Sequence, residues 1–266
     1  MGLIRSSTLT AAALAGGLLS TASARDLPEI EKRGTLRVLA VLSADETYFI
    51  CNEPRGGFDW ELLEAFGKLK KIQIHLVAVS GWEELIPALT RGEGDVIAGG
   101  FTASEARRRL IDFTIETFPT RSVAFTRKPT RPVQSLDELK TMRIGTLKGS
   151  FMYDDLLASG IPAQKIDDTI QTGRIPEALK SGKITAGIDG IEAALIAERK
   201  DPDLQIGFFL GKPLSLAYGV RKRDAQLLAA LNEYLANVRR TATWSRLAVK
   251  YFGASAPEIL KKARAE

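Results

Sequence analysis

The stretch Ala88-Leu-Thr-Arg-Gly-Glu-Gly-Asp-Val-Ile-Ala-Gly-Gly100 aligns without gaps on a later stretch, Ala178-Leu-Lys-Ser-Gly-Lys-Ile-Thr-Ala-Gly-Ile-Asp-Gly190. The identities are few, but they fall on the turn between an apolar helix and an apolar strand. In this pairing Asp189 of the second copy stands where Gly99 stands in the first. The repeat predicts two similar lobes, whose strand ends lie at the edge where open α/β sheets bind ligands.

The residues around each copy extend the repeat into a complete unit. Lys140-Thr-Met-Arg-Ile-Gly-Thr-Leu147 echoes Gly34-Thr-Leu-Arg-Val-Leu-Ala-Val41. The hydrophobic periods of the first unit predict β-α-β-α-β over residues 35–42, 58–69, 72–79, 82–90 and 95–98. Those of the second predict the same order over residues 140–147, 150–158, 165–170, 176–180 and 184–188. This order indicates the α/β class, with right-handed crossovers and an open parallel sheet in each lobe.

Two short apolar runs that end in Arg-Lys lie near the boundaries of the second unit. They are Ser122-Val-Ala-Phe-Thr-Arg-Lys128 and Leu216-Ala-Tyr-Gly-Val-Arg-Lys222. We interpret them as two strands that cross between the lobes, with the hinge near 122–128 and 216–222. Lobe 1 then comprises residues 25–122 and 220–266, and lobe 2 comprises residues 123–219.

The two ends of the mature chain are expected to belong to lobe 1. Residues 29–34 are interpreted as a polar lead-in to the first strand. Amphipathic helices are predicted over residues 224–238 and 243–251, where Gly253 and Pro257 stop the second one. Trp60 lies on the apolar face of the helix over 58–69 and is expected in the core.

The first 24 residues have the features of a removable signal peptide. Arg5 precedes an apolar run over residues 9–19, and Ala22-Ser-Ala24 is a small-residue cleavage site. The apolar run is shorter than the roughly 20 residues that span a bilayer. No cysteine directly follows the cleavage site, so a lipid anchor is not expected. The mature protein is predicted to be exported in soluble form.

Composition excludes several classes of function. Cys51 is the only cysteine and His75 the only histidine, so we expect no internal disulfide, no metal site, no cofactor and no Ser-His-Asp triad. The formal net charge is +5. Basic residues nowhere interleave with aromatic residues in a long stripe, so nucleic-acid binding is not expected.

A candidate anion site follows the first copy of the repeat. Glycines at 99 and 100 let a ligand approach the backbone, and Thr102 or Ser104 can cap a helical turn. Three consecutive arginines, Arg107 to Arg109, offer guanidinium forks that match carboxylates. These residues alone do not choose among the three arginines.

Short motifs occur in one order along the mature chain. They are Gly34-Thr-Leu-Arg-Val, Gly57-Phe-Asp-Trp-Glu-Leu, Trp82-Glu-Glu-Leu-Ile-Pro-Ala-Leu, Gly94-Asp-Val-Ile-Ala-Gly, Thr102-x4-Arg107-x4-Asp112-Phe-Thr, Gly149-Ser150, Ser181-Gly-Lys-Ile-Thr-Ala-Gly-Ile-Asp189 and Trp244-x6-Tyr251-Phe-Gly. In them the chain resembles the periplasmic solute-binding proteins of family 3, the amino-acid receptors of ABC importers. The resemblance implies a type II periplasmic binding protein that closes two lobes around a small ligand and delivers it to a membrane permease.

The resemblance also implies roles for polar residues. In the family, the arginine five residues before the Asp-Phe pair binds the α-carboxylate, which selects Arg107. Thr102 and the backbone at Gly100 would supplement it. Ser150 stands where the second lobe offers a hydroxyl group to the same carboxylate. Asp189 stands where an acid holds the α-ammonium group.

Aromatic residues are expected to line the ligand's side chain. Trp82 matches the family's aromatic wall, and Tyr48 lies in the loop that supplies the opposite wall. Phe151 replaces a hydroxyl residue that commonly follows Ser150. The loop also differs from the family pattern, since it has Tyr48-Phe-Ile-Cys51 in place of a proline-phenylalanine pair.

Two other functions remain open from the sequence. Some relatives of this fold are dehydratases, and a cleft acid such as Asp189 or Glu192 could act as general acid. A ligand sensor that resembles the regulatory domains of lytic transglycosylases or receptor kinases is the third reading. Binding without catalysis is the expectation, with an amino acid or a derivative as ligand and an ABC permease as partner.

Overall fold

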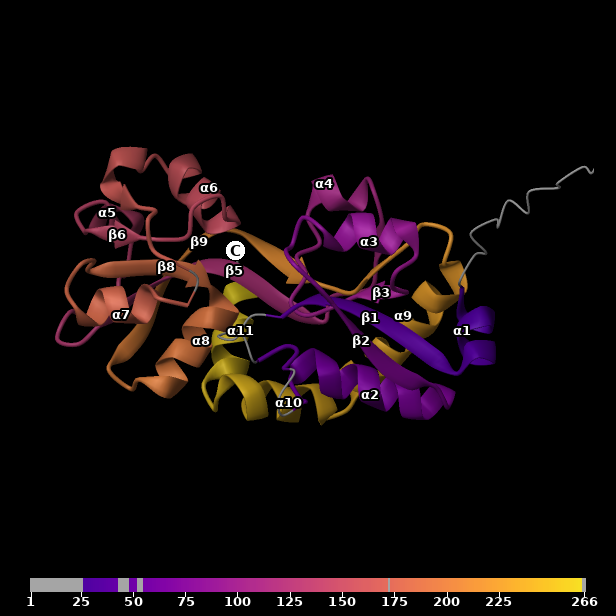
Figure 1. The fold of residues 1–266 in the computed structure, drawn as a ribbon. Coiled ribbons are helices and arrows are strands. Elements are labelled where there is room, and N and C mark those ends of the chain that lie inside the picture. Colours follow the sequence, from indigo (N-terminus) through magenta and orange to yellow (C-terminus); the bar gives the residue numbers. More distant parts are fainter. Residues whose placement is uncertain (1–25, 43–47, 52–54, 172, 265–266) are drawn as a thin grey trace, which may run out of the picture.

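The computed structural model describes residues 26–42, 48–51, 55–171 and 173–264. These residues form two five-stranded mixed sheets, with strand orders β2-β1-β3-β10-β4 and β7-β6-β8-β5-β9. Each sheet and its helices make one lobe, and the lobes lie side by side (Figure 1). The predicted α/β class and two-lobed architecture are confirmed. The predicted signal peptide, residues 1–24, lies outside the described residues.

The first lobe contains the predicted β-α-β-α-β unit. Its elements are β1 (Thr35–Val41), α2 (Phe58–Lys70), β2 (Gln73–Val79), α3 (Leu85–Arg91) and β3 (Val96–Ile97). β1 pairs in parallel with both β2 and β3. Two short strands, β4 (Asp112–Phe113) and β10 (Gly219–Val220), complete the sheet, and β10 is antiparallel to its neighbours. The three strands of the unit are parallel, as expected, and the whole sheet is mixed because the returning chain adds the antiparallel strand β10.

The second lobe repeats this arrangement. Its unit consists of β6 (Ile144–Gly145), α6 (Phe151–Ala158), β7 (Ile166–Asp167), α7 (Ile175–Lys180) and β8 (Ala186–Gly190). β6 is parallel to β7 and β8. Short helical turns, α5 (Leu136–Leu139) and η1 (Ala163–Lys165), and the longer α8 (Ile191–Lys200) lie around it. The long strands β5 (Phe118–Arg127) and β9 (Leu204–Leu216) make this sheet mixed as well.

The internal repeat extends to individual hydrogen bonds. The Arg37 N–H donates to Asp95 Oδ2 at 2.9 Å, and the equivalent Arg143 N–H donates to Thr185 Oγ1 at 3.0 Å. In return, the Asp95 N–H donates to the Arg37 carbonyl at 2.8 Å, and the Thr185 N–H donates to the Arg143 carbonyl at 2.9 Å. The two copies therefore hold their first and third strands together in the same way.

The chain passes between the sheets twice, at residues 114–117 and 217–218. β5 and β9 run antiparallel from this junction into the second sheet, with Phe118 opposite Leu216 and Arg127 opposite Leu204. Residues 122–128, where one hinge strand was expected, overlap β5. Residues 216–222 cover the end of β9 and all of β10.

The Glu116 carboxylate accepts hydrogen bonds from three side chains near these connections. Its Oε2 accepts from the Ser215 hydroxyl at 2.8 Å, and its Oε1 accepts from Arg239 at 2.9 Å and from Arg264 at 2.6 Å. Burial acts to raise the pKa of Glu116, but these hydrogen bonds hold it below its ordinary value. The carboxylate ties both passages of the chain to its C-terminal helices.

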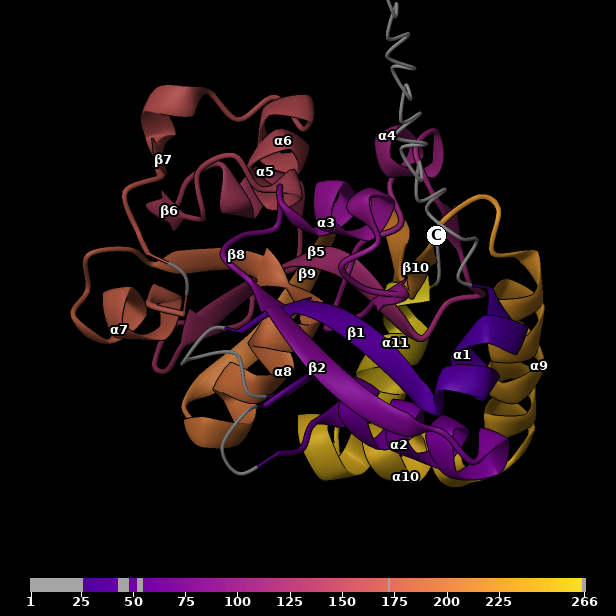
Figure 2. The same cartoon turned by 45° about the vertical axis from the view of Figure 1, so that its right-hand side comes forward.

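Three helices close the chain. α9 (Ala225–Arg240) joins the first lobe, where the Leu227 N–H donates to Asp26 Oδ1 at 2.8 Å. α10 (Thr243–Phe252) contacts α2 and α9 of that lobe and also α8 of the other. α11 (Ala256–Arg264) lies against β5, α8 and β9. Figure 1 shows α10 and α11 beneath the junction of the lobes, whereas Figure 2 shows α9 beside α1 at the outer edge of the first lobe.

The sequence interpretation of the two ends was wrong in two places. The expected lead-in is a helix, α1 (Leu27–Arg33), because the Asp26 side chain caps it and Gly34 ends it in the left-handed conformation. Gly253 does end α10, but Pro257 does not end the helical region. It lies in the first turn of α11, where a missing N–H costs nothing.

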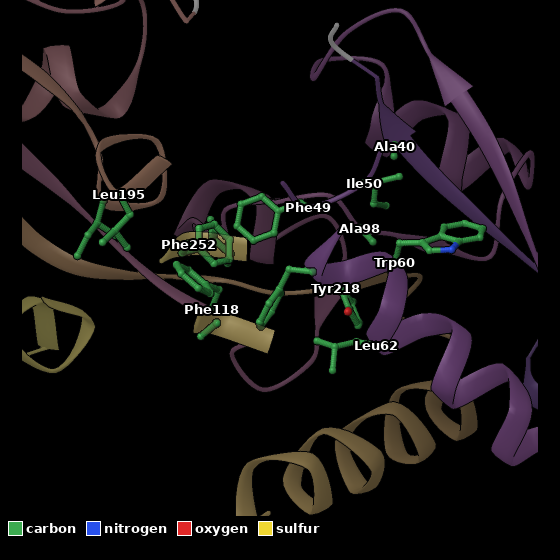
Figure 3. Close-up of a cluster of buried hydrophobic side chains, with 14 of the residues drawn as sticks. Ala40, Phe49, Ile50, Trp60, Leu62, Ala98, Phe118, Leu195, Tyr218 and Phe252 are labelled. Atoms are coloured by element: carbon green, nitrogen blue, oxygen red, sulfur yellow. The ribbon is translucent and has the colours of Figure 1, made fainter. Parts of the chain in front are cut away.

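The largest hydrophobic cluster spans the junction of the lobes. Phe118 packs on Phe252 with ring centroids 4.4 Å apart, and both rings contact Phe49. Figure 3 shows these three rings beside Tyr218, whose side chain points toward the α2 residues. Trp60 is buried, as predicted. Within the described ranges, no helix is both long and apolar enough to cross a bilayer.

Candidate functional site

A cavity of about 680 Å³ lies between the two lobes. Its lining includes all eight residues that the sequence selects: Tyr48, Trp82, Gly100, Thr102, Arg107, Ser150, Phe151 and Asp189. The volume is within the range of small-molecule sites. The fold therefore brings these residues to one cavity, and their roles toward a ligand stay a prediction.

The segment after β3 shapes the first-lobe wall. Gly99 and Gly100 have φ angles of 94° and 81°, which side-chain-bearing residues rarely adopt. A Cβ atom on Gly100 would also lie 2.7 Å from the Phe49 ring. Ser104 then caps the short α4 (Glu105–Arg108), accepting from the Arg107 N–H at 3.4 Å. This cap sets the start of α4 and thereby the position of Arg107 on the helix.

Of the three arginines, Arg107 alone lines the cavity. Its guanidinium carbon lies 4.0 Å from the centroid of the Phe101 ring, and its Nη1 donates to the Thr102 carbonyl at 2.9 Å. Trp82 stacks parallel on the same Phe101 ring, at 6.4 Å and 4°. Burial lowers the pKa of Arg107, although a guanidinium stays charged at neutral pH. The site thus holds a half-buried, pre-oriented cation.

The two neighbouring arginines lie outside the cavity lining. Arg108 lies over the Phe113 ring at 5.2 Å and donates from Nε to the Ala103 carbonyl. Arg109 is exposed. The three arginines therefore have different surroundings in the structure, although their residue type is the same.

The second-lobe wall is built on the start of α6. Gly149 adopts a φ of 68°, and Ser150 caps the helix by accepting from the Tyr153 N–H at 3.2 Å. The Ser150 hydroxyl donates to the Leu147 carbonyl at 2.7 Å. Phe151 and Met152 follow on the cavity lining. This helix start presents backbone N–H groups and a hydroxyl group on the side opposite to Arg107.

Two carboxylates come from the start of α8. Asp189 is the penultimate residue of β8, and its Oδ1 accepts from the Gly190 N–H at 2.8 Å. Glu192 lies on the first turn of α8, where its Oε2 accepts from the Thr120 hydroxyl at 2.6 Å. Both side chains are partly buried and line the cavity. The cavity therefore has an anionic wall on lobe 2 and a cationic group on lobe 1.

Further charged residues line the cavity, and some of them form ion pairs. Arg174 binds Glu177 at 2.6 Å, and Asp201 lies 3.4 Å from Arg127. Lys200 also lines the cavity. Among the described residues, no group of three His, Cys, Asp or Glu side chains is arranged to hold a metal ion.

Sequence reasoning missed two residues that shape the site, Asp59 and Phe101. Phe101 is buried and supports both Arg107 and Trp82. Asp59 is 1% exposed, and its Oδ2 accepts from the N–H groups of Gly99 and Gly100. The signal for Asp59 was present, since helical spacing places this acid on the same face as Leu62, Leu63 and Phe66.

Comparison with known proteins gives one family match and several relatives. The family described as bacterial extracellular solute-binding proteins, family 3, matches residues 44–254. The lysine/arginine/ornithine-binding periplasmic protein of Escherichia coli is 27% identical over 267 residues, which cover 94% of this chain and 97% of that protein. A solved ancestral arginine-binding protein, bound to arginine, is 27% identical with a TM-score of 0.64, over 83% of this chain and 99% of that one.

A longer relative is the membrane-bound lytic murein transglycosylase F of Desulfosudis oleivorans. It is 26% identical over 236 residues, which cover 87% of this chain and 52% of that protein. The chain therefore spans about half the length of this relative.

Proposed function

Since the chain belongs to the bacterial extracellular solute-binding proteins of family 3, we propose that it captures a small zwitterionic ligand between its lobes and delivers it to an ABC importer. One observation carries this proposal: a guanidinium on lobe 1 and a carboxylate on lobe 2, Arg107 and Asp189, line the same cavity. In this proposal Arg107 binds the α-carboxylate in bidentate fashion, and Asp189 binds the α-ammonium group.

The other lining residues take supporting roles. Thr102, Ser150 and the Gly100 backbone lie near the α-carboxylate, with the Gly100 N–H already committed to Asp59. Trp82, Tyr48 and Phe151 form apolar walls for the side chain. Closure of the lobes traps the ligand and creates the surface that the permease recognises. The protein works in the periplasm as a monomer, without catalysis.

We further propose a ligand with a cationic side chain. Two relatives are named for lysine, arginine and ornithine binding or for arginine binding. In this chain Glu192 adds a second carboxylate to the wall that carries Asp189. A buried carboxylate favours a cationic partner, since the partner offsets its loss of hydration.

A thermal-shift screen tests this function. Arginine, lysine, ornithine and histidine are compared with glutamine, glutamate and leucine. A cognate ligand at 100 times its Kd stabilises the folded state by about 2.7 kcal/mol, so a clear rise in Tm is expected for at least one cationic amino acid. A preference for glutamate or leucine would contradict the cationic class, and no response to any member would contradict amino-acid binding.

Replacing Ser150 with alanine separates two roles of one residue. Loss of a helix N-cap costs about 1 kcal/mol. Ser135→Ala, which removes the cap of α5 away from the cavity, is the matched control. We expect similar losses of stability in urea unfolding, but only Ser150→Ala should weaken ligand binding, by roughly 10- to 150-fold for one hydrogen bond to a carboxylate. Equal affinities in calorimetry would remove Ser150 from the binding site.

A dehydratase-like enzyme is the second candidate, and the position of Glu192 in the cavity favours it over other reactions. Glu192 would then act as general acid toward a leaving hydroxyl group. Turnover of a prephenate-like substrate that Glu192→Gln abolishes would support this candidate. Absence of product at saturating substrate would dismiss it, as would turnover that the variant retains. A sensor role would leave amino-acid binding intact but require no permease.

A further inference from the structure

The N-terminus of α2 holds one of the cavity-lining segments. The Phe58 N–H donates to the Tyr48 carbonyl at 2.7 Å, and the Asp59 and Trp60 N–H groups donate to the Phe49 carbonyl at 3.0 and 3.2 Å. Tyr48 and Phe49 line the cavity. The N–H groups at the start of α2 thus hold the Tyr48–Phe49 segment of the cavity lining in place.

The Asp59 side chain holds a second segment. Its Oδ2 accepts from the Gly99 N–H at 2.9 Å and from the Gly100 N–H at 3.1 Å. Both glycines line the cavity and have positive φ angles. One buried carboxylate therefore fixes the backbone that leads from β3 to Thr102 and Arg107.

The same carboxylate reaches the connections between the lobes. The Tyr218 hydroxyl donates to Asp59 Oδ1 at 3.2 Å. Tyr218 lies in the connection at 217–218, and it exchanges hydrogen bonds with Thr114 of the other connection. The Tyr218 N–H donates to Thr114 Oγ1 at 3.0 Å, and the Thr114 N–H donates to the Tyr218 carbonyl at 2.9 Å. Figure 3 shows the Tyr218 side chain among residues of the junction core.

We propose that Asp59 is a positioning residue for ligand binding, which orients the Gly99–Gly100 segment and joins it through Tyr218 to the two connections between the lobes. The inference rests on the proposed function, because it describes the support of the same cavity. Asp59 does not line the cavity itself. It acts on the ligand through the backbone that carries Thr102 and Arg107.

Because Asp59 is buried, both stability and ligand binding are expected to depend on pH through this carboxyl group. Burial raises its pKa to about 6, against the lowering effect of the Gly99 and Gly100 N–H groups and of the Tyr218 hydroxyl. The titratable groups that face it are tyrosines: Tyr218, whose pKa burial raises well above its ordinary value, and behind it Tyr234 of α9, with a pKa raised to about 12. Neither tyrosine ionises between pH 5 and 8, and no cation is among the hydrogen bonds that the described residues make to Asp59.

The sign of the pH effect follows from this shift. The folded state binds the Asp59 proton more tightly than the unfolded chain does, so the stability that this group contributes falls as the pH rises from about 4 to about 6. Ligand binding is expected to show the opposite trend. The ionised carboxylate makes stronger hydrogen bonds to the two glycine N–H groups than the neutral acid, so the segment is held best above pH 6.

Two substitutions of Asp59 test the positioning role. Asp59→Ala leaves two glycine N–H groups without their acceptor, and we expect the Kd for arginine to rise about 10-fold or more. Asp59→Asn keeps an oxygen for the glycines and an amide N–H for the Tyr218 oxygen, so it should recover most of the affinity at pH 5. Glu64→Gln, on the same helix, is the matched control. An Asp59→Ala affinity equal to that of Glu64→Gln would overturn the proposal.

The pH profile distinguishes positioning from mere folding. Between pH 8 and pH 5 the wild-type Kd for arginine should rise about 3- to 10-fold, as charge-assisted hydrogen bonds become neutral ones. Asp59→Asn should show no such step, and Tyr218→Phe should move the midpoint to higher pH, because it removes a donor that favours the ionised acid. An Asp59→Asn profile that keeps the wild-type step would overturn the assignment.

A ligand-free measurement keeps this proposal separate from the proposed function. Amide hydrogen exchange at Gly99 and Gly100 is measured in the apo protein. We expect the protection of both amides to be lost in Asp59→Ala and kept in Asp59→Asn and Glu64→Gln. Even if the wild type binds no amino acid, this measurement shows whether Asp59 orders the Gly99–Gly100 segment. Unchanged protection in Asp59→Ala would overturn the positioning role.

Discussion

Replacing Arg107 with alanine is expected to weaken amino-acid binding by more than an order of magnitude. The guanidinium is half-buried, stacked on Phe101 and held by the Thr102 carbonyl, so it meets a carboxylate without first losing side-chain freedom. Removing one partner of a buried, hydrogen-bonded charge pair costs about 2–5 kcal/mol, which corresponds to a Kd raised roughly 30- to 4,000-fold. Isothermal titration calorimetry with arginine and lysine measures this change.

The control for this variant lies two residues away. Arg109 belongs to the same run of three but is exposed and does not line the cavity. Arg109→Ala should leave the Kd within a factor of about 2, because an exposed charge contributes less than 1 kcal/mol. Arg107→Lys should restore only part of the affinity, since an ammonium group lacks the planar fork. Wild-type affinity in Arg107→Ala would contradict the assignment of the α-carboxylate site.

The largest expected loss of stability comes from Asp95→Ala. The carboxylate is 0% exposed, and it accepts from Arg33 at 2.6 Å and from the Arg37 side chain at 2.8 Å. Arg221, itself 5% exposed, lies 3.9 Å away. Deleting the acid leaves these cations without their shared partner, and such a loss typically costs about 3–5 kcal/mol. Urea unfolding should show a lower midpoint with a similar m-value.

An exposed ion pair provides the comparison for Asp95. Asp137 lies 3.4 Å from Lys140 but is 92% exposed. Asp137→Ala should change the free energy of unfolding by less than about 0.5 kcal/mol. If Asp95→Ala unfolds as the wild type does, the buried cluster that joins α1, β1 and β3 contributes no stability, and the prediction fails.

The elements that were predicted well are those with strong periodicity. The helices α2, α9 and α10 and the β-α-β-α-β order of each lobe follow from apolar spacing within single segments. α1 was missed because its helical form depends on the Asp26 and Gly34 caps, and α11 was missed because Pro257 was interpreted as a stop although it lies in the first turn of that helix. The mixed character of both sheets was missed because strand pairing is decided between segments, not within them.

The candidate site, too, was predictable from the sequence only in part. The residue types of Arg107, Asp189 and Ser150, and their positions at strand and helix ends, were readable from the repeat and the family motifs. The supporting contacts were not. Phe101 is one apolar residue among many until the fold places Arg107 on its ring, and Asp59 is an ordinary helix-start acid until Gly99 and Gly100 approach it.

The sequence by itself therefore determined the fold class and the internal repeat, and with the family motifs it selected eight of the residues that line the cavity, Arg107 among them, because each depends on local periodicity and local chemistry. Only the tertiary structure decided that Phe101 supports Arg107, which acid supports the glycine segment, and how Glu116 and Tyr218 join the connections between the lobes. These two kinds of result differ because the second depends on the folded chain as a whole. These choices depend on burial and on contacts between residues far apart in sequence, and such contacts form only when the whole chain is folded.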